Sequence, residues 1–150
     1  MKIVAKTDVG MVRESNQDSY TTGELPNGVA WAVVCDGMGG AAGGNVASST
    51  AVKVIAEQIT SSFRPGMSAN SIKNMMVSAI NAANISVYDI SCSNSELYGM
   101  GTTVVCAIVM EHIAYIAHAG DSRAYIVSHG ALTQLTRDHS VVQELVEHGK

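Results

Sequence analysis

The chain has 150 residues, of which 47% are hydrophobic and 15% are charged. This is the composition of one globular domain, or of part of a larger one, and it excludes a disordered or collagen-like chain. The net charge of −4, with nine Lys and Arg scattered along the chain, argues against nucleic acid or an anionic membrane surface as the main partner.

The first third of the chain predicts two strands separated by a polar loop. Residues 2–9 alternate between polar and apolar side chains, which favours a strand, and residues 10–18 are polar and loop-like. Residues 29–35 are almost continuously apolar, which is typical of a strand covered on both faces.

Two helices are expected next. Residues 45–63 place apolar side chains on one helical stripe, and Arg64-Pro65-Gly66 ends it. The second helix has Ser68, Asn70 or Ser71 as its N-cap and carries a Met-rich apolar face. Methionines at this spacing usually fill a core, so no ligand role is assigned to them.

The last part of the chain predicts antiparallel strands. They are expected over residues 102–110, 113–118 and 122–127, joined as a meander of hairpins, with a further turn at 128–130. A final helix would begin near residue 140, capped by Asp138 or Ser140. Strands, then helices, then antiparallel strands is the order of an α+β fold.

The cysteines and the apolar runs bear on location. Cys35 and Cys106 lie within apolar, strand-like runs, and together with Cys92 they form no CxxC pair, which indicates reduced thiols in a cytoplasmic protein. The N-terminus shows no signal peptide, and the longest apolar run, residues 104–110, is too short to cross a bilayer.

A glycine-rich loop follows the strand at 29–35. Its glycines do not match a dinucleotide site, because Ala42 stands at the third glycine position, and it lacks the lysine of a P-loop. Asp36 at the strand end would repel a bare phosphate, whereas hard cations such as Mg²⁺ and Mn²⁺ prefer carboxylate and carbonyl oxygens. The competing interpretation is a tight strand-to-helix turn in which backbone amides satisfy Asp36.

Five short motifs occur in order along the chain: RxxNQD at 13–18, DGMGG at 36–40, MGTT at 100–103, AGDSRAY at 119–125 and LTxDHS at 135–140. Together they resemble the PPM family of metal-dependent serine/threonine phosphatases, the protein phosphatase 2C-like enzymes, and the Met in DGMGG resembles the bacterial branch. The resemblance implies an αββα four-layer sandwich, in which helices flank two antiparallel sheets and the metal site lies in the cleft between the sheet edges.

The resemblance also implies roles for individual residues. Asp36 would bridge two Mn²⁺ or Mg²⁺ ions, with the Gly37 carbonyl as a ligand to one of them. Asp18 would hold metal-bound water in the outer shell, and Asp121 would help bind a third, weaker ion. Arg13 would bind the substrate phosphate, for which its planar guanidinium is well shaped.

The implied activity is hydrolysis of phosphoserine and phosphothreonine on proteins by a water that bridges the two metals. Phosphorylated proteins, and a serine/threonine kinase with its substrates, would be the partners, and Cys35 would be a spectator. Two departures matter. Met38 stands where many relatives outside bacteria carry a His that protonates the leaving group, and Gln17 replaces a Glu.

Family catalytic domains are considerably longer and take further metal-binding aspartates from their C-terminal part. Residues 1–150 are therefore expected to be the N-terminal part of one catalytic domain, lacking the C-terminal strands and metal ligands, with little activity alone. The alternative is a non-catalytic, phosphatase-like regulatory or binding module.

Two other chemistries are weaker interpretations. Ser122 in GDSRA lies between strands and does not fit a nucleophile elbow. Asp138, His139 and Ser140 are adjacent in sequence, so their side chains point apart and cannot form a relay. No histidine spacing indicates zinc, and His118 is expected to be a buried histidine with satisfied hydrogen bonds.

Overall fold

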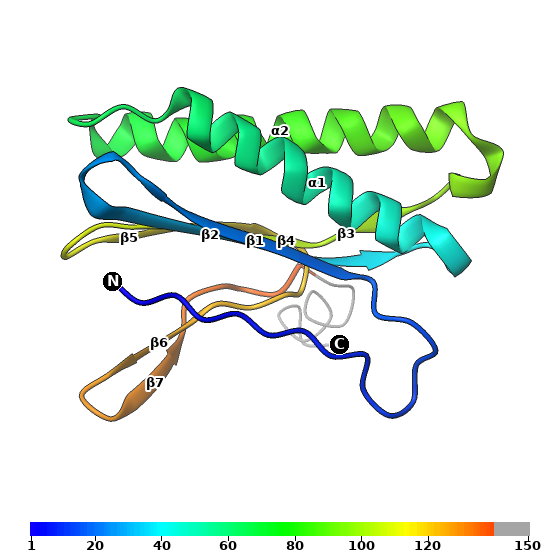
Figure 1. Ribbon diagram of the computed structural model, residues 1–150, viewed down its shortest axis with the longest axis horizontal. Coiled ribbons are helices and arrows are strands. Elements are labelled where there is room, and N and C mark those ends of the chain that lie inside the picture. Colours follow the sequence, from blue (N-terminus) through cyan, green and yellow to red (C-terminus); the bar gives the residue numbers. More distant parts are fainter. Residues whose placement is uncertain (140–150) are drawn as a thin grey trace, which may run out of the picture.

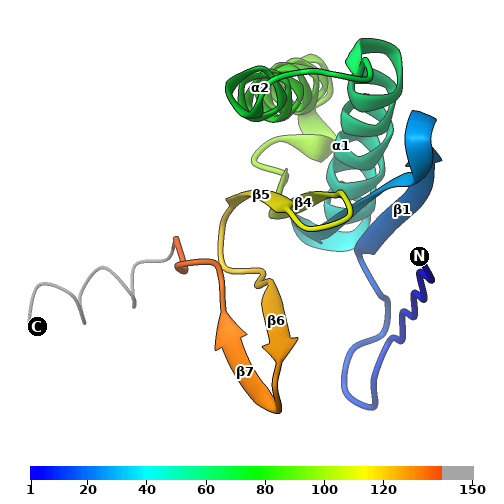
Figure 2. The same ribbon diagram turned by 90° about the vertical axis from the view of Figure 1, so that its left-hand side faces the viewer.

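The structure is a computed structural model that describes residues 1–139, apart from the side chain of Ala41. Two long helices cover one face of an antiparallel sheet, and a small hairpin lies beyond the opposite face (Figures 1 and 2). The strands are β1 (Asp18–Leu25), β2 (Val29–Met38), β3 (Gly101–Thr102), β4 (Val104–Val109), β5 (Ala114–Ala119), β6 (Tyr125–Ser128) and β7 (Ala131–Gln134). The helices are α1 (Gly40–Ser62), α2 (Ala69–Ser93) and the short 3-10 turns η1 (Pro26–Gly28) and η2 (Ser95–Leu97).

The larger sheet has the order β1-β2-β4-β5, with β3 pairing with the end of β2. All of its neighbouring strands are antiparallel. The α+β class and the expected pair of antiparallel sheets are confirmed, and the described residues supply both sheets and the helices on one outer face.

Strand β2 has one face that is buried along its whole length and one that becomes exposed in its second half. Trp31, Val33 and Cys35 are buried against the helices, whereas Val34 and Asp36 are exposed on the opposite face. The expectation that this strand is covered on both faces is therefore wrong for its second half. Because consecutive side chains of a strand point to opposite faces, the burial of Cys35 places Asp36 on the exposed face.

The two helices follow the apolar stripes of the sequence. Helix α2 begins after Ser68, whose hydroxyl accepts a hydrogen bond from the Ser71 amide at 3.1 Å, so Ser68 is the N-cap among the three candidates. Met75 and Met76 on its inner face are buried in the core, as expected. Helix α1 begins at Gly40, five residues before the predicted start, because the glycine-rich segment is itself helical.

The predicted meander of three strands is correct for β4 and β5 and wrong for the next step. The chain leaves the larger sheet at Gly120, whose φ is +102°. Strand β6 then pairs with β7 in a separate two-stranded sheet. The turn between them has positive φ at His129 and Gly130, as in a type I′ hairpin.

Residues 2–9 do not form the predicted strand. They are exposed and have no ladder partner among the described residues, so their alternation buries nothing. Strand β1, in contrast, was not predicted, because its sequence DSYTTGEL is mostly polar. In residues 1–139, no helix has the length and apolar character needed to span a membrane. The helix expected from residue 140 lies outside the described residues.

The start of α1 lies unusually close to the end of β2. A Cβ atom built on Gly37 would collide with the carbonyl oxygen of Gly44 in α1, and one built on Gly39 would lie 2.7 Å from the Met100 Cα. Gly37 therefore permits the backbone contact between β2 and α1, and Gly39 permits the close approach of Met100, which precedes β3.

This contact predicts that Gly37→Ala destabilises the chain by about 1–3 kcal/mol or more, since backbone atoms must move to make room. Gly101→Ala is the matched control, because its Cβ would lie 3.8 Å from the Met38 Cγ, an ordinary contact distance. Urea denaturation of both variants measures the difference. Equal losses of stability would show that the close approach of β2 and α1 is not what constrains Gly37.

Candidate functional site

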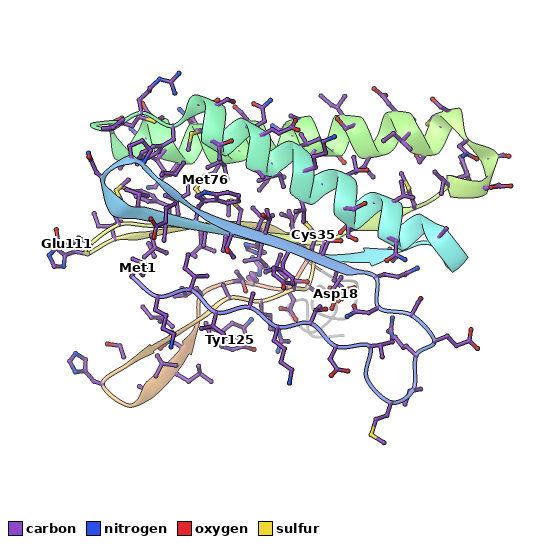
Figure 3. The ribbon with its side chains drawn as sticks, viewed as in Figure 1. Met1, Asp18, Cys35, Met76, Glu111 and Tyr125 are labelled. Carbon is purple, nitrogen blue, oxygen red and sulfur yellow. The ribbon has the colours of Figure 1, made fainter. Side chains whose placement is uncertain are left out.

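Two aspartates face each other across the β1–β2 ladder. Asp18 is the Cα partner of Asp36 in the antiparallel register. Residues directly opposite in a ladder project to the same side of the sheet, here the side away from the helices. Figure 3 shows Cys35, the neighbour of Asp36, on the helix side and Asp18 on the other.

The Asp36 carboxyl group experiences several charges at once. Partial burial raises its pKa, as do a hydrogen bond with Asp18 and repulsion by the Asp18 and Asp121 carboxylates, while the Arg13 guanidinium lowers it. Three residues, Arg13, Asp18 and Asp121, therefore act on the carboxyl group of Asp36. The structure brings Asp18 and Asp36 into contact and places Arg13 and Asp121 within electrostatic reach of them.

The backbone of Asp36 is held by Thr103, whose side chain is buried. The Asp36 amide donates to the Thr103 Oγ1 at 3.0 Å, and the Thr103 amide donates to the Asp36 carbonyl at 2.9 Å. The Thr103 hydroxyl also hydrogen-bonds the Ser122 hydroxyl at 2.6 Å. Ser122 is thus occupied in a contact that links the Asp121 segment to β2, and nothing there resembles an activated nucleophile.

Gln17 connects the N-terminal loop to α1, a role that the sequence did not reveal. Its carbonyl accepts a hydrogen bond from the Gly37 amide at 3.0 Å, and its Nε2 donates to the Gly40 carbonyl at 2.8 Å. The side chain also packs against Gly44. A carboxylate could not donate to Gly40, which gives a physical reason for Gln at this position.

Asp138 binds Arg123 with both carboxylate oxygens, at 2.9 and 2.7 Å. These hydrogen bonds lower the pKa of Asp138 and raise that of Arg123. This ion pair joins the segment before β6 to the segment after β7, and the helix that Asp138 was expected to cap lies outside the described residues.

Two histidines stack beside this pair. The rings of His118 and His139 are 4.6 Å apart between centroids and 19° from parallel. The His118 Nε2 donates to the Arg137 carbonyl at 2.8 Å, so its hydrogen bond is satisfied as expected, although the residue is half-buried rather than buried. The Nδ1 atom of His139, which lies next to Asp138, accepts a hydrogen bond from the Gly120 amide.

The thiols of Cys35 and Cys106 are unreactive because they are buried. Burial raises the pKa of Cys35 and of Cys106 to about 12, and both face the core. A thiol with such a pKa is not a nucleophile at neutral pH. Cys92 is exposed, on α2.

The donor chemistry fits a hard divalent cation. Asp18 and Asp36 present carboxylate oxygens on one exposed face, and their mutual repulsion is what a cation would relieve. Within residues 1–139, no group of three or more His, Cys, Asp or Glu side chains lies close enough together to hold a metal ion. The set in this part of the chain is thus a partial one, and the ligand roles of Asp18, Asp36, Gly37 and Asp121 stay predictions.

Comparison with known proteins identifies relatives of this fold and site. Residues 12–147 match the family model of protein phosphatase 2C. A putative protein phosphatase 2C-type of Streptococcus pyogenes is 38% identical, and the match covers 100% of this chain and 60% of the relative. The Listeria monocytogenes serine/threonine phosphatase stp is 36% identical over 97% of this chain and 57% of its own length.

The chain also superposes on solved structures of related phosphatases. A serine/threonine phosphatase of S. agalactiae superposes with a TM-score of 0.86 at 34% identity, covering 96% of this chain and 58% of that structure. The catalytic domain of the serine/threonine protein phosphatase PstP, determined in complex with two manganese ions, superposes with a TM-score of 0.78 at 32% identity, over 96% of this chain and 58% of that one. The chain thus spans 57–60% of the length of the two curated relatives described.

The opposed carboxylates predict an unusual pH dependence of stability. The pKa of Asp36 is higher in the folded chain than in the unfolded chain. At pH values between these two pKa values, the folded chain therefore binds more protons than the unfolded chain. The free energy of unfolding of the metal-free chain should therefore fall as pH rises from about 4 through the raised pKa. Asp36→Asn should remove this part of the slope and stabilise the metal-free chain at pH 7 by about 0.2–1 kcal/mol.

Urea denaturation in EDTA across this pH range measures the effect. Asp89→Asn, at an exposed position on α2, is the control for the loss of one charge. An Asp36→Asn variant that is less stable than the unaltered chain at pH 7 would contradict the repulsion.

Proposed function

The chain belongs to the protein phosphatase 2C family, and on that premise we propose that it contributes the catalytic centre of a metal-dependent phosphatase acting on phosphoserine and phosphothreonine in proteins. We further propose that residues 1–150 are the N-terminal part of one catalytic domain. The observation that carries the proposal is the cross-strand pair of Asp18 and Asp36, with Arg13 and Asp121 close enough to shift the pKa of Asp36.

Each residue then has a defined task. Asp36 and the Gly37 carbonyl would hold two Mn²⁺ or Mg²⁺ ions, with a third ion at Asp121, while Asp18 would order water at the same face. When bound, such ions lower the pKa of a water molecule and offset the charge of phosphate oxygens. Arg13 would bind two phosphate oxygens with its guanidinium and orient the phosphorus.

The proton for the leaving group needs a source. Met38 ends β2 and is 57% exposed, and a thioether has no proton to give. Solvent water at this open edge would therefore protonate the serine or threonine alkoxide of the product.

Phosphorylated proteins, and a serine/threonine kinase that acts on the same proteins, follow as the proposed partners. A cytoplasmic location belongs to the same proposal, since two of the three thiols are buried and free, as in proteins of a reducing compartment.

The test uses a chimera in which residues 1–150 are followed by the remaining C-terminal part of the Streptococcus pyogenes relative. It should hydrolyse a phosphothreonine peptide only with Mn²⁺ or Mg²⁺. Arg13→Ala should lower kcat/KM by about 10²-fold because a charge-stabilising donor is lost. Asp36→Asn should abolish turnover, whereas Cys35→Ser and the charge control Asp89→Asn should leave it nearly intact.

Calorimetric titration with Mn²⁺ separates binding from chemistry in the same proteins. Residues 1–150 alone should bind Mn²⁺ weakly and release little phosphate. Turnover by this chain alone at the rate of the chimera would contradict the proposal that it is one part of the domain. A folded chimera without metal-dependent turnover would instead favour a non-catalytic binding module.

A further inference from the structure

We propose that His139 is a positioning residue: by pairing with Gly120, and with the support of the Arg123–Asp138 ion pair, it fixes the Asp121 carboxylate where it can bind a divalent cation beside Asp36. The inference rests on the proposed function, because it assigns a task to residues around one proposed ligand. The segment that contains His139, residues 135–139, is called the strap below.

The main contact is a pair of backbone-directed hydrogen bonds. The Gly120 amide donates to the His139 Nδ1 at 3.2 Å, and the His139 amide donates to the Gly120 carbonyl at 2.9 Å. His139 therefore holds both the amide and the carbonyl of Gly120, the residue that precedes Asp121. The Nδ1 atom must be unprotonated to accept, so the imidazole proton is on Nε2.

Gly120 needs such a partner. Its φ of +102° is a conformation that residues with a side chain rarely adopt, and a Cβ there would lie 2.8 Å from the Thr103 Cγ2. Glycine permits this close approach but has many other conformations available to it. The hydrogen bonds to His139 select one of them.

The His139 ring is itself held. It stacks on His118, which projects from β5 and is fixed in turn by its hydrogen bond to the Arg137 carbonyl. In the register of the sheet, His118 lies opposite Val105, which pairs with Val34 on β2. His118 is thus on the same face of the sheet as Asp36, and the strap crosses this face.

Residues that follow Asp121 are tied down as well. Ser122 bonds the Thr103 hydroxyl, which holds the Asp36 amide. Arg123 forms its two hydrogen bonds with Asp138 in the strap.

The next residue completes the attachment. The Ala124 amide donates to the Thr136 Oγ1 at 3.1 Å, and its carbonyl accepts from the Leu135 amide at 2.8 Å. Residues 120, 122, 123 and 124 are therefore all anchored, three of them by the strap.

Asp121 is the exception in this stretch. Its side chain is exposed and accepts no hydrogen bond from the described residues, yet its charge acts on Asp36. A fixed backbone whose carboxylate is engaged by none of residues 1–139 is the arrangement that a ligand requires. Groups that orient a metal ligand from behind typically change metal affinity by 10–100-fold when they are removed.

The test is a Mn²⁺ titration of the ¹⁵N-labelled chain, followed by paramagnetic broadening of the amide signals next to Asp36 and Asp121. His139→Ala should raise the Mn²⁺ dissociation constant at Asp121 about tenfold and speed the hydrogen exchange of the Gly120 amide. His139→Asn should return both toward the values of the unaltered chain, since an Asn side-chain oxygen can accept at about the position of Nδ1.

Two controls separate positioning from general stability. Ser68→Ala removes the N-cap of α2 far from the site and should lower the Tm without changing the Mn²⁺ dissociation constant. In an Asp121→Asn background, His139→Ala should have no further effect on Mn²⁺ binding.

Unchanged Mn²⁺ binding in His139→Ala, or an equal loss in Ser68→Ala, would overturn the inference and leave the proposed function standing. Absence of Mn²⁺ broadening next to Asp36 in the unaltered chain would overturn both.

Discussion

The site is built around an unfavourable contact between like charges. Asp18 and Asp36 are direct partners in an antiparallel ladder, where two ionised carboxylates destabilise the strands that carry them. The chain retains this contact on an exposed face, where Arg13 offsets only part of it. A divalent cation bound between the two carboxylates would replace their repulsion with coordination bonds. The contact is therefore expected at a metal site, whereas in a sheet without a metal it would only lower stability.

The rest of the fold holds these charges in place. Cys35 and its apolar neighbours on β2 bury one face of the strand under the helices, so that Asp36 must project from the other. Thr103 fixes the Asp36 backbone and connects it to Ser122. The close approach of Gly37 to Gly44 sets the position of α1. Core packing on one face therefore determines geometry on the opposite face.

The sequence predicted the features that depend on local pattern. The apolar stripe of α2 with Ser68 among its three N-cap candidates, the start of the strand at Val29 and the turn at 128–130 all follow from neighbours in the chain. Strand β2 continues to Met38, three residues beyond its predicted end. Features that depend on distant partners were not predictable in this way. Residues 2–9 alternate but have no strand to pair with among the described residues, and the polar strand β1 is ordered by its pairing with β2. Gln17 and His139 bond glycines that are distant in sequence, 20 or more positions away for Gln17 and 19 for His139.

The most direct test of the account is the carboxyl titration of Asp36, followed by ¹³C NMR with and without Mg²⁺. Without Mg²⁺ the pKa of Asp36 should lie above the ordinary range of an aspartate, and the titration should be shared with Asp18, because the two groups interact. Saturating Mg²⁺ should lower that pKa sharply. An ordinary pKa that Mg²⁺ leaves unchanged would contradict the claim that the two carboxylates form a cation site.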